Sequence, residues 1–240
     1  MRRVVIIPTY NECENVARMI DKVMSLAGGF DLLVVDDGSP DGTADIVRSK
    51  QSEYEGRVHL VERSGKLGLG TAYIEGFRWA LKGGYDQIFE MDCDFSHNPD
   101  DLLRFSSRLD ADGEVVVGSR YVKGVNVVNW PLSRLLMSYF ASKYVRFVTR
   151  MPVCDATAGF VGYRREVLEA IDLDKVRMIG YGFQIEMKYT AWRLGFHVVE
   201  ESIIFIDREE GTSKMSSGIF GEAFFGVLRL PWRKIRRKRN

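Results

Sequence analysis

Residues 31–39 of this chain read Asp-Leu-Leu-Val-Val-Asp-Asp-Gly-Ser, an apolar run that ends at two adjacent carboxylates. Residues 88–94, Ile-Phe-Glu-Met-Asp-Cys-Asp, repeat the arrangement. Ligands of open α/β sheets bind beyond the carboxyl ends of the strands. Carboxylates gathered there usually hold a cation or a sugar hydroxyl, although helix caps and turn residues are the plainer alternative. We expect the second cluster, an Asp-x-Asp, to bridge a divalent metal to phosphate oxygens.

Helices and strands alternate outward from these two clusters. The apolar pattern predicts strands over 3–7, 31–35, 57–61, 86–91, 114–118, 159–163 and 197–206. It predicts helices over 14–26, 42–52, 68–82, 131–148 and 181–194, the first opened by Asn11 and the second capped by Asp41. Most of the strands are continuous apolar runs, which is typical of a parallel sheet covered on both faces. We therefore expect a single Rossmann-like α/β domain with a mostly parallel central sheet.

The composition excludes several classes of protein. The 240 residues, 45% of them hydrophobic and 28% charged, suffice for one full core. Three widely spaced cysteines without a Cys-x-x-Cys pair argue against a zinc site and for a reducing compartment. No apolar run reaches the roughly 18 residues that span a bilayer, and no signal peptide precedes the first strand. These features favour a cytoplasmic protein.

Basic charge is concentrated at the C-terminus. Residues 229–240 contain seven Lys or Arg and no acid, which leaves 27 basic against 33 acidic residues in 1–228. A nucleic-acid binder would need a basic face, so we expect no nucleic-acid partner. An apolar stretch before the tail favours an interfacial helix on the cytoplasmic face of a membrane. The alternatives are a core helix with a solvated tail, or a small membrane-anchored protein partner.

Two loops at the same sheet edge carry candidate donor-binding groups. Three candidates follow the first strand. Pro8 stiffens the chain as it leaves the strand, Tyr10 offers a flat ring for a base or ribose, and Glu12 offers two oxygens that accept hydrogen bonds. Asp37 follows the second strand and could accept hydrogen bonds from a base, with Val35 packed beside it. Both loops lie at one edge, so we expect them to share a ligand.

The phosphates of such a ligand need a counter-charge. Neither a Gly-x-Gly-x-x-Gly nor a Walker-type loop occurs in the chain, so we expect a metal to supply it. Asp94 is the principal expected ligand, Asp92 a second one, and Ser96 could complete the shell. A cation bridging a diphosphate would stabilise a leaving group.

Longer motifs extend this set. They are Ile6-Ile7-Pro8-Thr9-Tyr10-Asn11-Glu12, the segment 34–43 (Val-Val-Asp-Asp-Gly-Ser-Pro-Asp-Gly-Thr), 66–73 (Lys-Leu-Gly-Leu-Gly-Thr-Ala-Tyr), 91–99 (Met-Asp-Cys-Asp-Phe-Ser-His-Asn-Pro), Gly118-Ser119-Arg120-Tyr121, Gly159-Phe160, 182–187 (Gly-Phe-Gln-Ile-Glu-Met) and 211–216 (Gly-Thr-Ser-Lys-Met-Ser). Over residues 3–216 the chain thereby resembles glycosyltransferase family 2, and within it the dolichyl- or polyprenyl-phosphate mannose synthases.

The resemblance implies a GT-A fold and an inverting transfer of mannose from GDP-mannose to a polyprenyl (dolichyl) monophosphate, with Mg or Mn. The implied donor-site residues are Pro8, Tyr10, Glu12, Val35, Asp37, Asp92, Cys93, Asp94, Arg120 and Lys214. The middle residue of the metal motif is commonly Ala in the family, so Cys93 predicts thiol sensitivity. Some relatives continue into membrane helices, which this sequence does not show.

The chemistry needs no general base, because a lipid monophosphate is already ionised near neutral pH. The enzyme must instead hold two anions close together. Their Coulomb repulsion is roughly 4 kcal/mol for unit charges ~4 Å apart at an effective dielectric of 20. The candidate groups are Arg120, Arg134, Ser138, Arg208 and Lys214. By resemblance the first three match acceptor-phosphate positions, and Lys214 matches a loop that closes over the donor. We therefore expect Asp94, Arg120, Arg134 and Ser138 to be the catalytic residues.

The expected organisation is a GT-A domain over residues 1–216, with a donor half (1–118) and an acceptor half (119–216), followed by an amphipathic helix and basic tail (217–240). Asp155 is expected near the sugar, Glu186 on sugar hydroxyls and Gln184 supporting a loop. Two other functions remain open. One is a UDP-sugar-dependent glucosyl- or N-acetylglucosaminyltransferase acting on the same lipid. The other is a non-catalytic phospho-signalling module, since receiver domains also carry paired acids.

Overall fold

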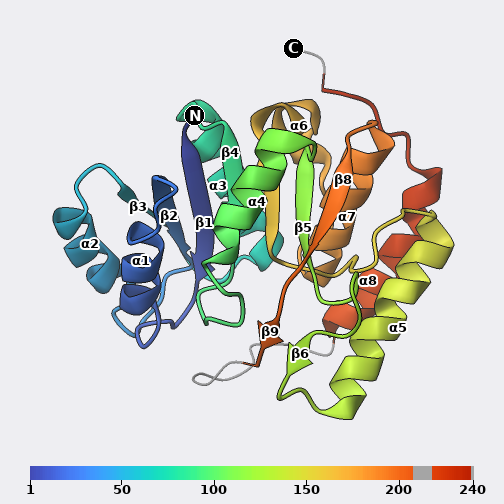
Figure 1. The fold of residues 1–240 in the computed structure, drawn as a ribbon, viewed down its shortest axis with the longest axis horizontal. Helices are drawn as coiled ribbons and strands as arrows, with labels where there is room; N and C mark the ends of the chain where they lie inside the picture. The colour runs from blue at the N-terminus through green and yellow to red at the C-terminus, as the bar shows by residue number, and fades with distance from the viewer. Residues whose placement is uncertain (208–217, 239–240) are drawn as a thin grey trace.

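The computed structural model describes residues 1–207 and 218–238 and is built on a seven-stranded sheet (Figure 1). The strands are β1 (Arg3–Thr9), β2 (Phe30–Asp36), β3 (Val58–Glu62), β4 (Gln87–Glu90), β5 (Val115–Ser119), β7 (Val161–Arg164) and β8 (Val198–Ser202), in the order β3-β2-β1-β4-β7-β5-β8. β7 runs antiparallel to β4 and β5, and the other pairs are parallel. The predicted mostly parallel sheet is confirmed.

Helices cover both faces of the sheet (Figure 1). They are α1 (Val16–Met24), α2 (Thr43–Glu53), α3 (Leu69–Lys82), α4 (Asp101–Ala111), α5 (Leu132–Thr149), α6 (Arg165–Ala170), α7 (Tyr181–Arg193) and α8 (Gly218–Arg229). Val4 and Ile6 of β1 pack in one core cluster with α3, α6 and α7, while Val5 and Ile7 pack in the other with α1, α2 and α4. Successive strand residues face opposite sides, so two buried faces require an unbroken apolar run.

The strand predicted over 197–206 is two strands. β8 follows β5 until Ser119 pairs with Ser202, and the Ile203 amide then donates to the Ser119 carbonyl at 3.1 Å. Beyond that point β9 (Phe205–Ile206) leaves the main sheet and pairs with β6 (Val127–Val128). The ladder of β5 ends there, so the chain must find a new partner.

The expected start of the first helix is wrong, because Asn11 has a left-handed backbone, with φ 56°, and α1 begins at Val16. Asp41 was expected to cap the second helix but lies one residue before its N-cap, which is Gly42. Its carboxylate accepts from the Thr43 amide at 3.0 Å at the start of α2. Helix α4 was not predicted, although Leu102, Phe105 and Leu109 mark its buried face at helical spacing.

The C-terminal segment returns along the domain after α8 (Figure 1). A short 3-10 turn (Leu230–Trp232) ends the helix, and Ile235 packs against the core cluster that contains α7. The Lys238 amide donates to the Ala170 carbonyl at 2.9 Å. Residues 233–238 thus form a strap against the rest of the domain. Over 1–207 and 218–238 no helix has the length and apolar character to cross a membrane.

Candidate active site

The Asp-x-Asp follows the end of β4 directly. A left-handed turn at Phe95, with φ 57°, folds the chain back so that the Ser96 amide donates to Asp94 Oδ1 at 3.1 Å. Cys93 is buried between the two acids and packs in the core. The Asp92 side chain is 41% exposed. The alternation of the strand thus continues through the motif, with the carboxylates outward and the thiol inward.

A cavity of about 750 Å³ opens at these carboxylates. Its polar lining is Asp92, Asp94, Ser96, His97, Arg120, Arg134, Ser138 and Gln184. Its apolar lining from α5 and α8 is Met137, Phe140, Ala141, Tyr144, Val145, Phe224, Phe225 and Val227. All four predicted catalytic residues and all three predicted metal ligands therefore line one space. Their roles stay predictions, but the fold brings them together.

The residues present fit a hard divalent cation whose remaining ligands come from a substrate. No cluster of three or more His, Cys, Asp or Glu suited to a metal occurs within the described parts of the chain. Mg²⁺ is usually held by one or two carboxylates together with substrate phosphates, and two are what this motif supplies. Ser96 Oγ is buried and has no hydrogen-bond partner within residues 1–207 and 218–238. It is therefore available to a ligand beside Asp94.

Arg120 is held by a buried carboxylate. Its Nε and Nη2 donate to the two oxygens of Asp155 at 2.6 and 2.7 Å, and its backbone amide adds a third bond at 3.0 Å. Asp155 has no exposed surface. Burial alone would raise the pKa of Asp155, but the charge and hydrogen bonds of Arg120 bring it below its ordinary value. The pair fixes the guanidinium at the cavity wall.

Arg134 and Ser138 lie one turn apart on α5, as their spacing predicts. Arg134 Nη1 pairs with Asp207 Oδ1 at 2.7 Å, and Tyr121 donates its hydroxyl to Ser138 Oγ at 2.8 Å. Trp130 connects the two arginines, because its ring lies 4.2 Å from the Arg134 guanidinium and 5.3 Å from that of Arg120. Trp130 was not among the predicted site residues, because its position depends on the β6–β9 pair.

The expected donor residues gather at the ends of β1 and β2. Pro8 pairs in register with Val35, and the Asp37 amide donates to the Thr9 carbonyl at 2.9 Å. Lys66 Nζ lies 5.2 Å from the Tyr10 ring. Val35 itself is fully buried in the core, so its side chain offers no exposed surface here.

Asp37 pairs with an arginine that the sequence analysis missed. Arg63 Nη1 lies 3.0 Å from Asp37 Oδ1, and Arg63 Nη2 donates to Thr71 Oγ1 at 2.6 Å. Burial raises the pKa of Asp37, and the positive charge of Arg63 opposes that shift. Glu12 is placed on the same edge by its amide, which donates to Thr43 Oγ1 at 3.0 Å.

Glu186 does not line the cavity as expected, whereas Gln184 does. Gln184 lines the cavity, and its Nε2 donates to the buried Glu90 Oε2 at 2.6 Å. Glu186 accepts from the amides of Arg177 and Met178 at 3.0 and 2.9 Å, and it supports that loop. His97 also lines the cavity, where burial lowers its pKa to about 4 against the opposing effect of Asp94. The candidates Arg208 and Lys214 lie outside the described residues.

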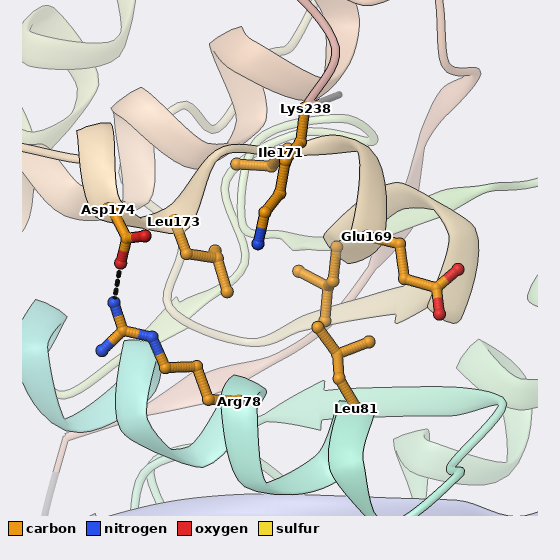
Figure 2. A pocket seen from close by; sticks show the side chains of 8 residues that line it. Arg78, Leu81, Glu169, Ile171, Leu173, Asp174 and Lys238 are labelled. Atoms are coloured by element: carbon orange, nitrogen blue, oxygen red, sulfur yellow. Dashed lines mark hydrogen bonds and ion pairs between the residues drawn. The ribbon is translucent and has the colours of Figure 1, made fainter. Parts of the chain in front are cut away.

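A second, smaller cavity of about 380 Å³ lies at the other end of the sheet (Figure 2). It lies between the C-terminal end of α3 and the segment after α6, and an Arg78–Asp174 ion pair closes one side. Figure 2 shows Lys238 of the C-terminal strap projecting toward it. Its lining contains none of the predicted site residues.

The model of the family described as "Glycosyl transferase family 2" matches residues 4–172. The chain belongs to glycosyltransferase family 2. It is 46% identical over 229 residues to an undecaprenyl-phosphate mannosyltransferase of Micrococcus luteus, with 95% of this chain and 93% of that protein covered. It is 47% identical over 226 residues to a polyprenol monophosphomannose synthase of Mycolicibacterium smegmatis, with 94% and 85% covered.

This family-2 glycosyltransferase also resembles solved structures. Glucosyl-3-phosphoglycerate synthase from Mycobacterium tuberculosis, in complex with Mn²⁺, UDP and glucosyl-3-phosphoglycerate, matches with a TM-score of 0.66 at 18% identity. The match covers 95% of this chain and 78% of that one, and it supports the GT-A fold. Membership of an enzyme family also overturns the alternative of a non-catalytic signalling module.

Proposed function

We propose that this glycosyltransferase transfers mannose from GDP-mannose to a polyprenyl (dolichyl) monophosphate, with inversion at the sugar. The observation that carries the proposal is the single cavity in which Asp94, Arg120 and Arg134 meet the apolar walls of α5 and α8. A phosphate on an isoprenoid chain needs cations at one end and an apolar lining at the other. The names of the two relatives at 46% and 47% identity support the same acceptor and sugar.

The donor is proposed to bind at the edge formed by β1, β2 and the Asp-x-Asp, which makes residues 1–118 the donor half. Tyr10, Glu12 and Asp37 would hold the nucleoside there. Asp92 and Asp94, with Ser96 beside them, are the residues that would hold Mg or Mn, whose chemistry is to neutralise a leaving diphosphate.

The acceptor is proposed to bind in residues 119–216, where Arg120, Arg134 and Ser138 orient its phosphate oxygen toward the anomeric carbon. No base is required, because the phosphate is ionised already. Because the bound phosphate is already positioned, the loss of translational and rotational entropy occurs on binding and does not add to the barrier of the reaction. Arg208 and Lys214 remain proposed contributors to the acceptor and donor sites.

The first experiment compares labelled GDP-mannose, UDP-glucose and UDP-N-acetylglucosamine with a short polyprenyl phosphate, with Mg or Mn and with EDTA. Mannolipid is expected from GDP-mannose alone, and chelation is expected to abolish it. Transfer from a UDP-sugar would keep the mechanism and replace the sugar.

Asp94→Asn tests the metal assignment in the same assay. Outer-shell changes at metal sites cost about 10–100-fold, so loss of a direct ligand is expected to lower turnover by more than ~100-fold. The matched control is Glu55→Gln, at an exposed position between α2 and the start of β3. This variant should remain fully active. A near wild-type rate for the Asp94 variant would show that the metal assignment is wrong.

We also propose that α5 and α8 place the cavity at the cytoplasmic face of a membrane. Large apolar side chains are exposed on both helices and just beyond them: Leu132, Leu136, Phe140 and Phe147 from α5, and Phe224, Phe225 and Trp232 from the C-terminal segment. Three of them, Phe140, Phe224 and Phe225, also line the apolar part of the cavity, where a lipid would enter. Apolar groups of this size favour the headgroup–acyl boundary.

Phe147→Glu tests the membrane proposal, because this ring is 86% exposed and its loss leaves the core intact. Co-sedimentation with phosphatidylglycerol vesicles is expected to fall. Leu103→Glu, on α4, is the control and should bind as wild type does. Equal binding by all three proteins would favour a membrane-anchored protein partner instead.

A further inference from the structure

The two arginines of the cavity have counter-ions of different kinds. Arg120 forms a two-pronged pair with Asp155, in which the side chains are 9% and 0% exposed. Arg134 forms a one-pronged pair with Asp207, and those side chains are 35% and 28% exposed. A buried, bidentate pair is costly to separate, whereas a partly exposed ion pair is less so. The Arg134–Asp207 pair is therefore the one that a ligand can open.

The surroundings hold Arg134 in place without Asp207. The indole of Trp130 lies 4.2 Å from its guanidinium, and the same ring stands beside Arg120 at 5.3 Å. Such cation–π contacts orient a guanidinium and weaken the repulsion between two of them. Trp130 packs in turn on Phe205 at 5.2 Å. An incoming anion would thus find Arg134 already positioned.

The backbone of Asp207 is anchored by strand pairing, and its side chain is 28% exposed. Its amide donates to the Val128 carbonyl at 3.1 Å, at the end of the β6–β9 pair. Rotation about its side-chain bonds can therefore move the carboxylate away while the strand pairing remains. Its charge also neutralises Arg134, as that of Asp155 neutralises Arg120, before a phosphate enters.

We propose that Asp207 is a stand-in for the acceptor phosphate: its carboxylate neutralises Arg134 in the empty enzyme and yields that arginine to the lipid phosphate. This inference rests on the proposed function, because it takes the acceptor to be a polyprenyl phosphate. A phosphate monoester carries about −1.5 to −2 charges at neutral pH and can displace a single carboxylate. The exchange makes Asp207 a specificity-determining residue, which keeps the site closed to weaker anions.

The test is equilibrium binding of farnesyl phosphate to the full chain, without donor. Asp207→Asn removes the competing charge and keeps the shape, so the Kd is expected to fall by about threefold to tenfold. Binding of farnesol, which has no phosphate, should not change. Asp174→Asn, a change of equal charge at the exposed pair shown in Figure 2, should leave the Kd of farnesyl phosphate unchanged.

A double-mutant cycle with Arg134→Ala tests whether the change in Kd arises from the Arg134–Asp207 pair. In that background Asp207→Asn is expected to give no gain, because the arginine that Asp207 pairs with is gone. An unchanged or higher Kd for Asp207→Asn, in a variant with wild-type melting temperature, would overturn the inference. So would an equal gain in the Arg134→Ala background.

Turnover separates this inference from the proposed function. If farnesyl phosphate binds as expected but no donor yields a lipid product, the assigned reaction fails and the Asp207 exchange stands. If mannose is transferred and Asp207→Asn does not lower the KM for the lipid phosphate, the exchange fails and the reaction stands.

Discussion

Asp36 and Asp37 are adjacent residues with different partners. Asp36 is buried, and its carboxylate accepts from Thr9 Oγ1 at 2.8 Å and from the amide and hydroxyl of Ser39 at 2.8 and 2.6 Å. Asp37 faces Arg63 instead. Because successive residues point to opposite sides, one acid closes the turn while the next pairs with Arg63. The plain interpretation as a turn residue is thus correct for Asp36.

Substituting the two acids is expected to separate stability from donor binding. Asp36→Ala leaves three donors without their acceptor, and should lower the free energy of unfolding by about 1–3 kcal/mol. Asp37→Asn should raise the KM for GDP-mannose and leave the KM for the lipid phosphate unchanged. Urea unfolding and steady-state kinetics on both variants check this. A donor KM raised by Asp36→Ala alone would reverse the assignment.

At the scale of elements, the strap formed by residues 233–238 joins α8 to the domain. Arg233 pairs with the buried Glu186 of α7 and with the Lys175 carbonyl, and Arg237 lies 5.1 Å from the Phe196 ring. Tyr144 of α5 stacks on Phe224 of α8 at 4.8 Å. The apolar wall of the cavity therefore depends on how the strap holds α8.

Arg233→Ala is expected to loosen that wall. Glu186 loses a charged partner, so the free energy of unfolding should fall by about 1–3 kcal/mol. The KM for the lipid should rise while that for GDP-mannose stays, since the donor edge lies on other elements. Arg236→Ala, at an exposed position of the strap, is the control. Equal changes in both KM values would show a general loss of structure instead.

At the scale of the whole molecule, a buried polar chain links the sheet to its covering helices. Glu90 of β4 accepts from Gln184 of α7, and Lys188 Nζ donates to the Ala158 carbonyl at 2.6 Å. Glu90 and Lys188 have no exposed surface. Burial raises the pKa of Glu90 to about 8, against the opposing effects of Gln184 and Lys188. Burial lowers the pKa of Lys188 to about 8, against the opposing effect of Glu90.

These shifts predict a pH dependence of stability. The Glu90 pKa rises from 4.5 to about 8 on folding, so the folded state binds more protons between these values. Its contribution is therefore complete below about pH 4.5 and is lost as the pH rises toward 8. The stability advantage of the wild type over Glu90→Gln should shrink between pH 5 and pH 8, measured by urea unfolding. A constant difference, as expected for Glu55→Gln, would contradict the prediction.

Local signals were sufficient for the sheet, and the residues expected to be catalytic or to hold a metal line one cavity, although their roles stay predictions. The apolar runs ending at Asp36 and Glu90 predict strands whose ends share one edge. Helix α4 and the break at Ile203 were missed for different reasons. The first signal, at Leu102, Phe105 and Leu109, was present in the sequence. The second was not, because Ile203 continues an apolar run and leaves the sheet only where β5 ends.

The residues alone therefore determine a sheet buried on both faces and an acidic edge, because both follow from the order of neighbouring side chains. Only tertiary structure decides the electrostatics and the boundaries of the site. Asp155 meets Arg120 across 35 residues, and Asp207 meets Arg134 across 73. Phe224 and Phe225 reach the same cavity from α8. Contacts at such separations leave no periodicity in the chain, because they depend on where whole elements pack.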